Sequence, residues 1–152
     1  MVRDMPHTTL KKREFETLSQ FRYQLRRFLR FSEQATRRHG ITPLQYLLLL
    51  HIKGFPGRDW ATVGELAERL QAQHHGVVAL ISRCEARDWV AREQGRTDRR
   101  EVEVRLTAKG ERMVDKMAQL HRDELLNLEG GFLLPRLQEP DASRKNGLAR
   151  GH

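Results

Sequence analysis

Two sets of polar side chains in this sequence could bind a nucleic acid, and the first lies in a short charged loop. This loop contains Arg96, Asp98, Arg99 and Arg100. Arginines at a loop tip suit contacts with phosphate oxygens, or insertion into the narrow minor groove of duplex DNA. A carboxylate among them would repel phosphate unless it is paired, so we expect Asp98 to orient Arg99 or Arg100 through a charge-assisted hydrogen bond. The alternative is a solvated loop that binds nothing.

The second set consists of Gln73, His74 and His75, with Arg83 further along the same segment. Glutamine can form a bidentate pair with adenine, and histidine can bond to guanine or phosphate. The alternative is a solvated start of a helix. Adjacent histidines on a helix point in different directions, so His74 and His75 are poor joint ligands for one metal ion. No other residues show sound metal-ligand spacing, and we predict no metal site and no cofactor.

A helix-turn-helix is expected to position the second set. Thr62 and Glu65 form a capping-box pattern that predicts a helix start, and apolar residues recur at helical spacing as far as Leu70. After the short linker 71–72, a second helix is predicted to begin near Gln73. In a helix-turn-helix, the N-terminal end of the second helix meets the base edges.

A hairpin is expected to position the charged loop. Residues 89–93 read as one short strand. In residues 102–106, valine and leucine alternate with Glu103 and Arg105, which is the period of a half-buried strand. Residues 94–100 join the two strands. A helix-turn-helix followed directly by a basic hairpin is the outline of a winged helix-turn-helix, which favours DNA contact over a solvated loop.

The segment before this lobe is predicted to be helical. Residues 11–39 lack Gly and Pro and form a long amphipathic helix. Thr42 and Pro43 start another helix as its N-cap and first residue, and the apolar run 44–52 indicates that this helix is buried. Trp60 lies in the loop that follows, where we expect it to pack onto the core.

After the hairpin, Thr107 is expected to cap a long helix that ends near Leu128, before Gly130 and Gly131. A short apolar segment, 132–134, precedes a polar tail. We expect this helix and the first one to form most of a dimer interface. The residues predicted to contribute are Leu18, Phe21, Leu25, Met117 and Leu125. Two methionines on one face of this helix could also form an adaptable ligand surface, although such residues more often fill a seam between helices.

The motif Asp98-x-Arg100, followed by Leu106-Thr107-x-x-Gly110, resembles the wing signature of the MarR family of bacterial transcriptional regulators. The segments VGELAERL and VVALISRCEARDWV also resemble that family's helix-turn-helix. The resemblance implies an obligate homodimer with an α–α–β–α–α–β–β–α–α layout that binds a palindromic operator. It also implies repression that is often relieved by a small ligand or an oxidant.

The chain departs from the family pattern at several positions. Asp88 stands where the family usually has Gly, and Ala79 where many members carry Arg or Lys. Cys84 occupies a leucine position, and residues 73–75 replace a turn rich in Ser and Thr. We expect these departures to change the operator sequence and not the mode of binding.

Composition is consistent with a basic DNA-binding protein. The 152 residues carry a formal net charge of +8, which attracts polyanions. No segment reaches the roughly 18 apolar residues of a membrane span, and residues 1–16 lack the apolar core of a signal peptide. The single cysteine, Cys84, cannot form an internal disulfide, which fits a reducing cytoplasm. We find no Gly-rich phosphate loop and no nucleophile beside an evident base, so we do not expect an enzyme.

The sequence therefore predicts a mainly α-helical protein with a small β-hairpin wing, a winged helix-turn-helix with a helical dimerisation region. The DNA-binding lobe should span 41–107, the dimerisation region 10–40 and 108–137, and the flexible termini 1–9 and 138–152. The expected function is a dimeric, sequence-specific transcriptional regulator in the cytoplasm, a repressor relieved by a small-molecule effector. Its expected partners are duplex DNA with a palindromic operator and a second copy of the chain, with no membrane.

Alternative functions follow from the same residues. A winged helix can bind a protein, or can bind nucleic acid as an architectural module. A regulator that responds to oxidation through Cys84 is a further alternative, although a buried structural thiol fits the apolar helix face better. Effectors in the family often bind near the helix that carries Tyr46 and His51. For His51, a hydrogen-bonded histidine at the core or its edge is the simpler interpretation.

Overall fold

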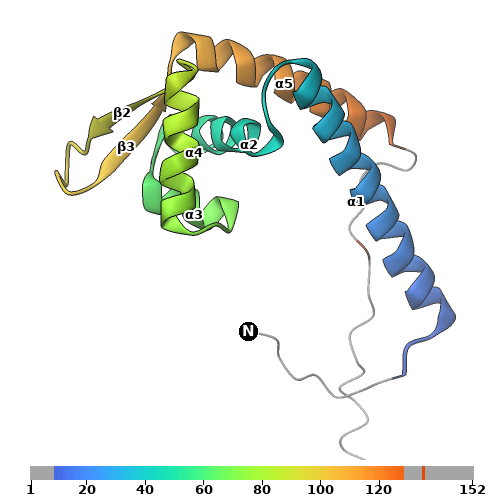
Figure 1. Cartoon of the computed structure of the whole chain (residues 1–152). Coiled ribbons are helices and arrows are strands. Elements are labelled where there is room, and N and C mark those ends of the chain that lie inside the picture. The colour runs from blue at the N-terminus through green and yellow to red at the C-terminus, as the bar shows by residue number, and fades with distance from the viewer. Residues whose placement is uncertain (1–8, 129–134, 136–152) are drawn as a thin grey trace, which may run out of the picture.

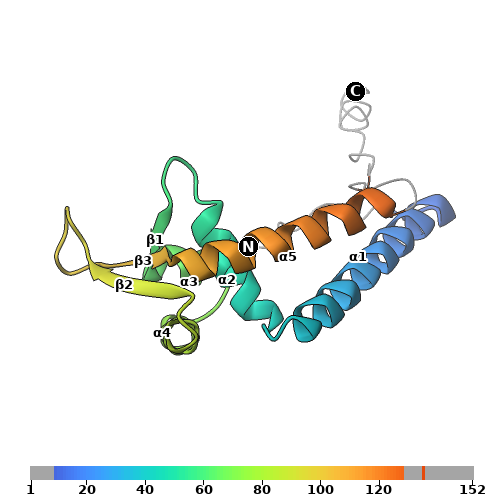
Figure 2. The ribbon, with the colours of Figure 1, turned by 90° about the horizontal axis from the view of Figure 1, so that it is seen from above.

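The structure is a computed structural model that describes residues 9–128 and residue 135. In chain order the described elements are α1 (Lys12–Arg38), α2 (Pro43–Lys53), β1 (Trp60–Thr62), α3 (Val63–Leu70), α4 (His74–Ala86), β2 (Val90–Gln94), β3 (Val102–Leu106) and α5 (Ala108–Asn127). Helices α2, α3 and α4 form one lobe with the sheet, whereas α1 lies beside the distal part of α5 (Figure 1, Figure 2). The predicted fold, mainly helical with a small wing, is confirmed.

Two helices begin with reciprocal capping bonds. The Thr42 hydroxyl accepts from the Gln45 N–H at 3.1 Å, and the Gln45 side chain accepts from the Thr42 N–H at 3.0 Å. Thr62 and Glu65 form the same pair at 3.2 and 3.0 Å. Each pair satisfies backbone amides that have no partner within their helix. The predicted starts of α2 and α3 are therefore confirmed.

The sheet has three antiparallel strands in the order β1-β3-β2. The residue pattern alone predicted only the hairpin and placed Trp60 in a loop, which is wrong. Trp60 begins β1 and pairs with Arg105, and Ala61 pairs with Val104. A strand of three residues is too short to show an alternation of its own, although the family resemblance implied a strand here. This strand attaches the hairpin to the start of α3.

The alternation predicted for β3 also needs correction. Val104 is fully buried as expected, but Val102 is 38% exposed and Glu103 is only 4% exposed. The Arg96 backbone N–H donates to Oε1 of Glu103 at 3.4 Å. This carboxylate therefore faces the wing loop, residues 95–101, instead of solvent.

The core of the described chain centres on α2. Its residues Leu48, Leu49 and Ile52 are fully buried, as the prediction of a buried helix requires, but Leu44 and Leu47 on the same helix are 56% and 36% exposed, so the helix is buried on one side only. Further buried side chains come from both sides of α2: Leu66, Ile81, Trp89, Val104 and Met117. The core thus joins the winged lobe to α5.

A tight junction fixes the start of α5. Asp88 ends the turn after α4 with a φ of 59°, a left-handed conformation that Asp tolerates better than most residues. The Trp89 carbonyl accepts from the Thr107 N–H at 3.0 Å, and the Thr107 hydroxyl accepts from the Gly110 N–H at 3.0 Å. A Cβ on Gly110 would lie 2.0 Å from the Trp89 carbonyl oxygen. Only glycine fits this contact between α5 and the end of the lobe.

Some predicted features lie outside the described residues. These are the helix break at Gly130 and Gly131, the apolar segment 132–134 and the tail 138–152. The division into a DNA-binding lobe and a dimerisation region remains a prediction. Among the helices of the described chain, none has the length and apolar character needed to cross a membrane.

Candidate nucleic-acid interface

The N-terminal end of α4 is exposed to solvent. Gln73 is the N-cap, and His74 and His75 are the first two helical residues. Gln73 thus stands just before the helix and not in its first turn, and its side chain makes no capping hydrogen bond. A Cβ on Gly76 would meet nothing within 4 Å. Side chains and free backbone N–H groups at this end can therefore meet an anionic ligand.

Helix α4 has one buried and one exposed face. The buried face consists of Val77, Leu80, Ile81 and Cys84. His75, Ala79 and Arg83 are spaced by four residues along the exposed side. Because Ala79 is small, it permits close approach of a ligand between the other two. The predicted contact residues His75 and Arg83 therefore belong to one face.

Asp98 holds Arg100 in the wing loop. The Arg100 backbone N–H and Nε–H donate to Asp98 Oδ1 at 3.0 and 3.2 Å, and Nη2 donates to Oδ2 at 3.4 Å. The backbone bond, followed by the side-chain bond, lowers the pKa of the Asp98 carboxyl. The predicted pairing is confirmed for Arg100, whose side chain is 91% exposed. The guanidinium is thus oriented while it still faces solvent.

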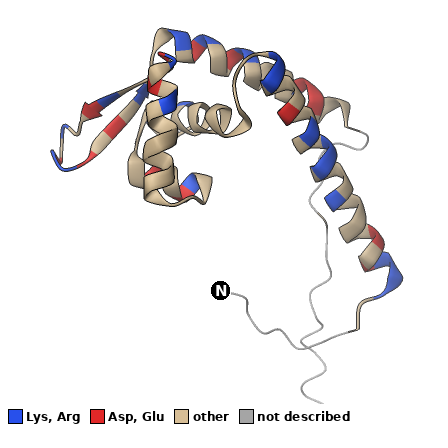
Figure 3. Ribbon diagram, viewed as in Figure 1, with Lys and Arg blue, Asp and Glu red and all other residues tan. Residues whose placement is uncertain are grey.

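The backbone of the wing loop is closed by its own hydrogen bonds. The Gly95 N–H donates to the Glu101 carbonyl at 2.9 Å, and the Glu101 N–H donates to the Asp98 carbonyl at 3.1 Å. A Cβ on Gly95 would lie 2.3 Å from that Asp98 oxygen, so the loop requires glycine. Arg96 and Arg99 are exposed. All three predicted arginines are therefore accessible at the tip, which Figure 3 shows as basic.

A groove of about 370 Å³ separates the helix-turn-helix from the wing. The start of α3 and His74 line it from the helical side, and Arg92, Arg100 and Glu101 are among the residues that line it from the wing. Arg92 was not among the predicted contacts. Its guanidinium donates to the Ser82 hydroxyl and, at 3.5 Å, to the Val78 carbonyl. Arg92 therefore ties β2 to α4, a contact that strand periodicity does not reveal.

The thiol of Cys84 is buried against the core. Its residue is 0% exposed, and burial raises the pKa of the thiol to about 11. The thiolate is the reactive form of cysteine, so a structural role is favoured over oxidation sensing. The described residues contain no group of three or more His, Cys, Asp or Glu side chains that could hold a metal ion.

We expect Cys84 in the folded protein to resist a thiol-specific reagent at pH 8. With a pKa of about 11, about one thiol in a thousand is ionised at that pH, and burial blocks access to it. Mass spectrometry after timed alkylation should show labelling only once urea unfolds the chain. Rapid labelling of the folded protein would instead revive the redox alternative.

A second cavity, of about 760 Å³, lies between α1, α2 and α5. His121 forms part of its wall: Nδ1 is 2.6 Å from the Met117 carbonyl oxygen and Nε2 is 2.7 Å from the Ser32 hydroxyl. Its ring stacks on Tyr46 with 4.5 Å between centroids. His121 thereby joins all three helices, a role that its position on a helical seam did not indicate. His51 does not line the cavity, and burial, followed by the charge of Arg69, lowers its pKa.

The predicted dimerisation residues fall into different environments. Leu18, Phe21 and Leu25 on α1 are partly buried in the single chain. Leu125 lines the cavity between α1, α2 and α5. Met117 is fully buried in the core of this one chain, so it fills an internal seam and offers no surface to a partner. We therefore leave Met117 out of any dimer surface.

The winged lobe is similar to proteins of one known family. A sequence model of the MarR family matches residues 39–101. A MarR family protein from Bacillus stearothermophilus has 24% identity, a TM-score of 0.68, and coverage of 79% of this chain and 82% of its own. AbsC, a MarR family transcriptional regulator from Streptomyces coelicolor, has 23% identity, a TM-score of 0.66, and coverage of 78% and 80%. An S. aureus MepR mutant bound to an oligodeoxyribonucleotide has 21% identity, a TM-score of 0.61, and coverage of 72% and 79%. No curated protein matches the chain.

Proposed function

Because a sequence model of the MarR family matches its winged lobe, residues 39–101, we propose that the chain is a transcriptional regulator of that family, a dimeric cytoplasmic repressor that binds a palindromic DNA operator. In this proposal α4 enters the major groove and the wing contacts the adjacent minor groove or its phosphates. Two α4 helices of a dimer, about one helical turn apart, would occupy successive major grooves and block polymerase. Proteins of this family are regulators and not enzymes.

The observation that carries the proposal is the groove shared by α4 and the wing. His74 at the start of α4 and Arg100 of the wing line this groove, and the hairpin projects beside α4 (Figure 1). A DNA backbone that passes from the major to the minor groove would run between these two elements. Arginines and the N-terminal end of α3 suit phosphate contacts there. The solved DNA complex of MepR, which has this fold, supports the same use of the lobe.

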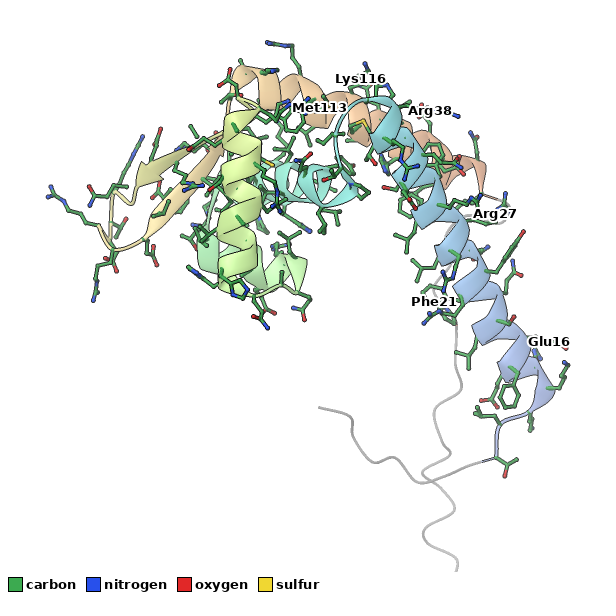
Figure 4. All side chains as sticks on the ribbon, viewed as in Figure 1. Glu16, Phe21, Arg27, Arg38, Met113 and Lys116 are labelled. Atoms are coloured by element: carbon green, nitrogen blue, oxygen red, sulfur yellow. The ribbon has the colours of Figure 1, made fainter. Side chains whose placement is uncertain are left out.

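We place the dimer contact on α1 and α5. The N-terminal part of α1, where Figure 4 labels Glu16 and Phe21, runs past the end of α5. Phe15 is 54% exposed there, and Leu126 of α5 is 75% exposed. Exposed apolar residues along a projecting helix favour a protein partner. A second copy, contacted through Leu18 and its neighbours, is the partner that we propose.

We assign the effector site to the cavity between α1, α2 and α5. Its volume of about 760 Å³ suits a small molecule. One wall is α2, which belongs to the winged lobe, and the others are helices of the proposed dimer region. A ligand there would change the angle between lobe and dimer helices, and hence the separation of the two α4 helices. His121 lies where such a movement would be transmitted.

Selection of bound duplexes from a random-sequence pool, followed by a salt titration, tests the proposed function. An enriched inverted repeat with half-sites about 10 base pairs apart is expected. If each subunit contacts about four phosphates, log affinity should fall with log salt with a slope near −7. Binding without an enriched motif would favour the architectural alternative. No duplex binding at low salt would overturn the proposal and favour a protein-interaction module.

Substitutions should separate base contacts from phosphate contacts. Gln73→Ala and His75→Ala are expected to alter sequence preference, at about 1–3 kcal/mol per lost base contact. Arg99→Ala should weaken binding to all duplexes alike and reduce the salt slope by about 2 per dimer. Anisotropy titrations against operator and scrambled duplexes measure both effects. Unchanged affinity in both Arg99→Ala and Arg100→Ala would remove the wing from the interface.

A further inference from the structure

Glu103 is a buried carboxylate directly behind the wing loop. Its Oε1 accepts from the Arg96 backbone N–H at 3.4 Å, and its Oε2 accepts from Nη2 of Arg105 at 3.3 Å. The residue is only 4% exposed. A buried charge is costly unless it is paired and hydrogen-bonded. Both oxygens of Glu103 are hydrogen-bonded, one to Arg105 and the other to the backbone of the wing loop.

Arg105 makes this buried charge tolerable. Glu93 lies directly opposite Glu103 across the two strands, and like charges in that relation destabilise a sheet. The Arg105 guanidinium donates to Glu93 at 3.2 Å and to Asp59 at 3.2 Å in addition to its bond with Glu103. One cation therefore holds three carboxylates on the sheet and on the loop before β1. Through Arg105, Glu103 is thus connected to β2 and to the loop before β1.

The two ends of the wing loop are held by two different carboxylates. Asp98 binds both the backbone and the guanidinium of Arg100, while Glu103 binds the backbone of Arg96. Asp98 is accessible at the tip, whereas Glu103 is shielded from solvent. A shielded carboxylate can accept a hydrogen bond without presenting an open charge to phosphate.

We propose that Glu103 is a positioning residue for DNA binding, which sets the direction in which Arg96 leaves the loop. This inference rests on the proposed function and adds a residue that does not itself touch DNA. The expected change in DNA affinity is opposite to the one that charge alone predicts. Removal of an acidic charge from a DNA-binding surface should tighten binding through long-range electrostatics. Loss of the Glu103 anchor should instead weaken binding, because Arg96 would no longer be held in place.

The test compares Glu103→Gln with Glu93→Gln in the full-length chain. Both changes remove one negative charge beside Arg105, but the Glu93 side chain is 48% exposed and its carboxylate binds Arg105 instead of the wing loop. Affinity for a random-sequence duplex is measured by anisotropy at low salt, in the wild-type and Arg96→Ala backgrounds. Glutamine has one acceptor oxygen for the two donors, and the charged Arg105 guanidinium should take it, so the Arg96 N–H should lose its acceptor. Glu103→Gln should therefore weaken binding on the order of fivefold, the equivalent of one hydrogen bond. Glu93→Gln should leave binding unchanged or tighter.

The Arg96→Ala background distinguishes positioning from general destabilisation. If Glu103 acts through Arg96, its loss should cost less than about twofold when Arg96 is already absent. An equal loss in both backgrounds, or binding by Glu103→Gln as tight as wild type, would overturn the inference and leave the proposed function intact. A wild-type chain that does not bind the duplex would overturn both.

A measurement without DNA covers the case in which Glu103→Gln does not fold. Hydrogen exchange of the wild-type backbone amides should show the Arg96 N–H protected relative to the Arg99 N–H, because Glu103 accepts from the former. Equal and fast exchange at both amides would show that the anchor is not maintained in solution. That result would overturn the inference.

Discussion

Replacement of Gly110 with Ala is expected to destabilise the protein by about 3 kcal/mol, at the upper end of the cost of overpacking. The added Cβ would lie 2.0 Å from the Trp89 carbonyl oxygen and 2.9 Å from the carbonyl carbon. The obstacle is backbone, so a change of rotamer cannot relieve it. The same oxygen accepts from the Thr107 N–H at 3.0 Å, and movement of Trp89 away from the new Cβ would break that bond at the start of α5. Either α5 or the end of the winged lobe must shift.

Thermal unfolding followed by circular dichroism measures this cost, at one fixed protein concentration because dimerisation affects apparent stability. A loss of about 3 kcal/mol should lower Tm by about 10 °C in a chain of this length. Gly64→Ala is the matched control, since a Cβ there would meet nothing within 4 Å and Ala favours helix. Its Tm should be equal or higher. If Gly110→Ala unfolds like wild type, α5 does not dock on the Trp89 carbonyl as described.

The helix starts and the wing-loop pairing were predictable because their signals are local. Thr62 and Glu65 are three residues apart and bond to each other. Asp98 and Arg100 are two residues apart and do the same. In each case the side chain and its partner belong to one turn, so residue types and spacing are enough to predict the hydrogen bond. The start of α4 lacks such a pair, because Gln73 makes no capping hydrogen bond, and the prediction accordingly placed Gln73 in the first turn instead of at the N-cap.

The features that were missed depend on residues far apart in the chain. Trp60 becomes part of a strand only because Arg105 lies beside it. Glu103 is buried because the wing loop folds over it and Arg105 pairs with it. His121 meets Ser32 across a separation of 89 residues. No periodicity in a short window specifies such partners, which are determined by tertiary packing.

Met117 illustrates the same difficulty for the dimer surface. An apolar residue on a helical face must be buried, but the sequence does not show whether it is buried by its own chain or by a second copy. The structure assigns Met117 to the chain's own core. Leu18 is only partly buried by its own chain, so it is the better position at which to test dimerisation.

Leu18→Glu is expected to convert the proposed dimer into monomers and to reduce operator affinity by about 100-fold or more. In a two-fold symmetric interface each substitution occurs twice, and a charge buried there without a partner costs several kcal/mol. A monomer retains one α4 and one wing, so it loses the gain in avidity of about 10²–10⁴ that linked half-sites provide. Light scattering measures the mass, and anisotropy against the selected inverted repeat measures affinity.

Leu44→Glu provides the matched control for this result. Leu44 is 56% exposed on α2, outside the proposed dimer surface, so the same change adds the same charge without entering the interface. We expect this variant to remain dimeric and to lose only the modest affinity that added negative charge removes. If Leu18→Glu loses both the dimer and operator binding while Leu44→Glu keeps both, operator binding depends on a dimer formed through α1. If Leu18→Glu stays dimeric, the dimer interface does not include this part of α1. If it becomes monomeric and binds the operator as tightly as wild type, one winged lobe is sufficient for binding.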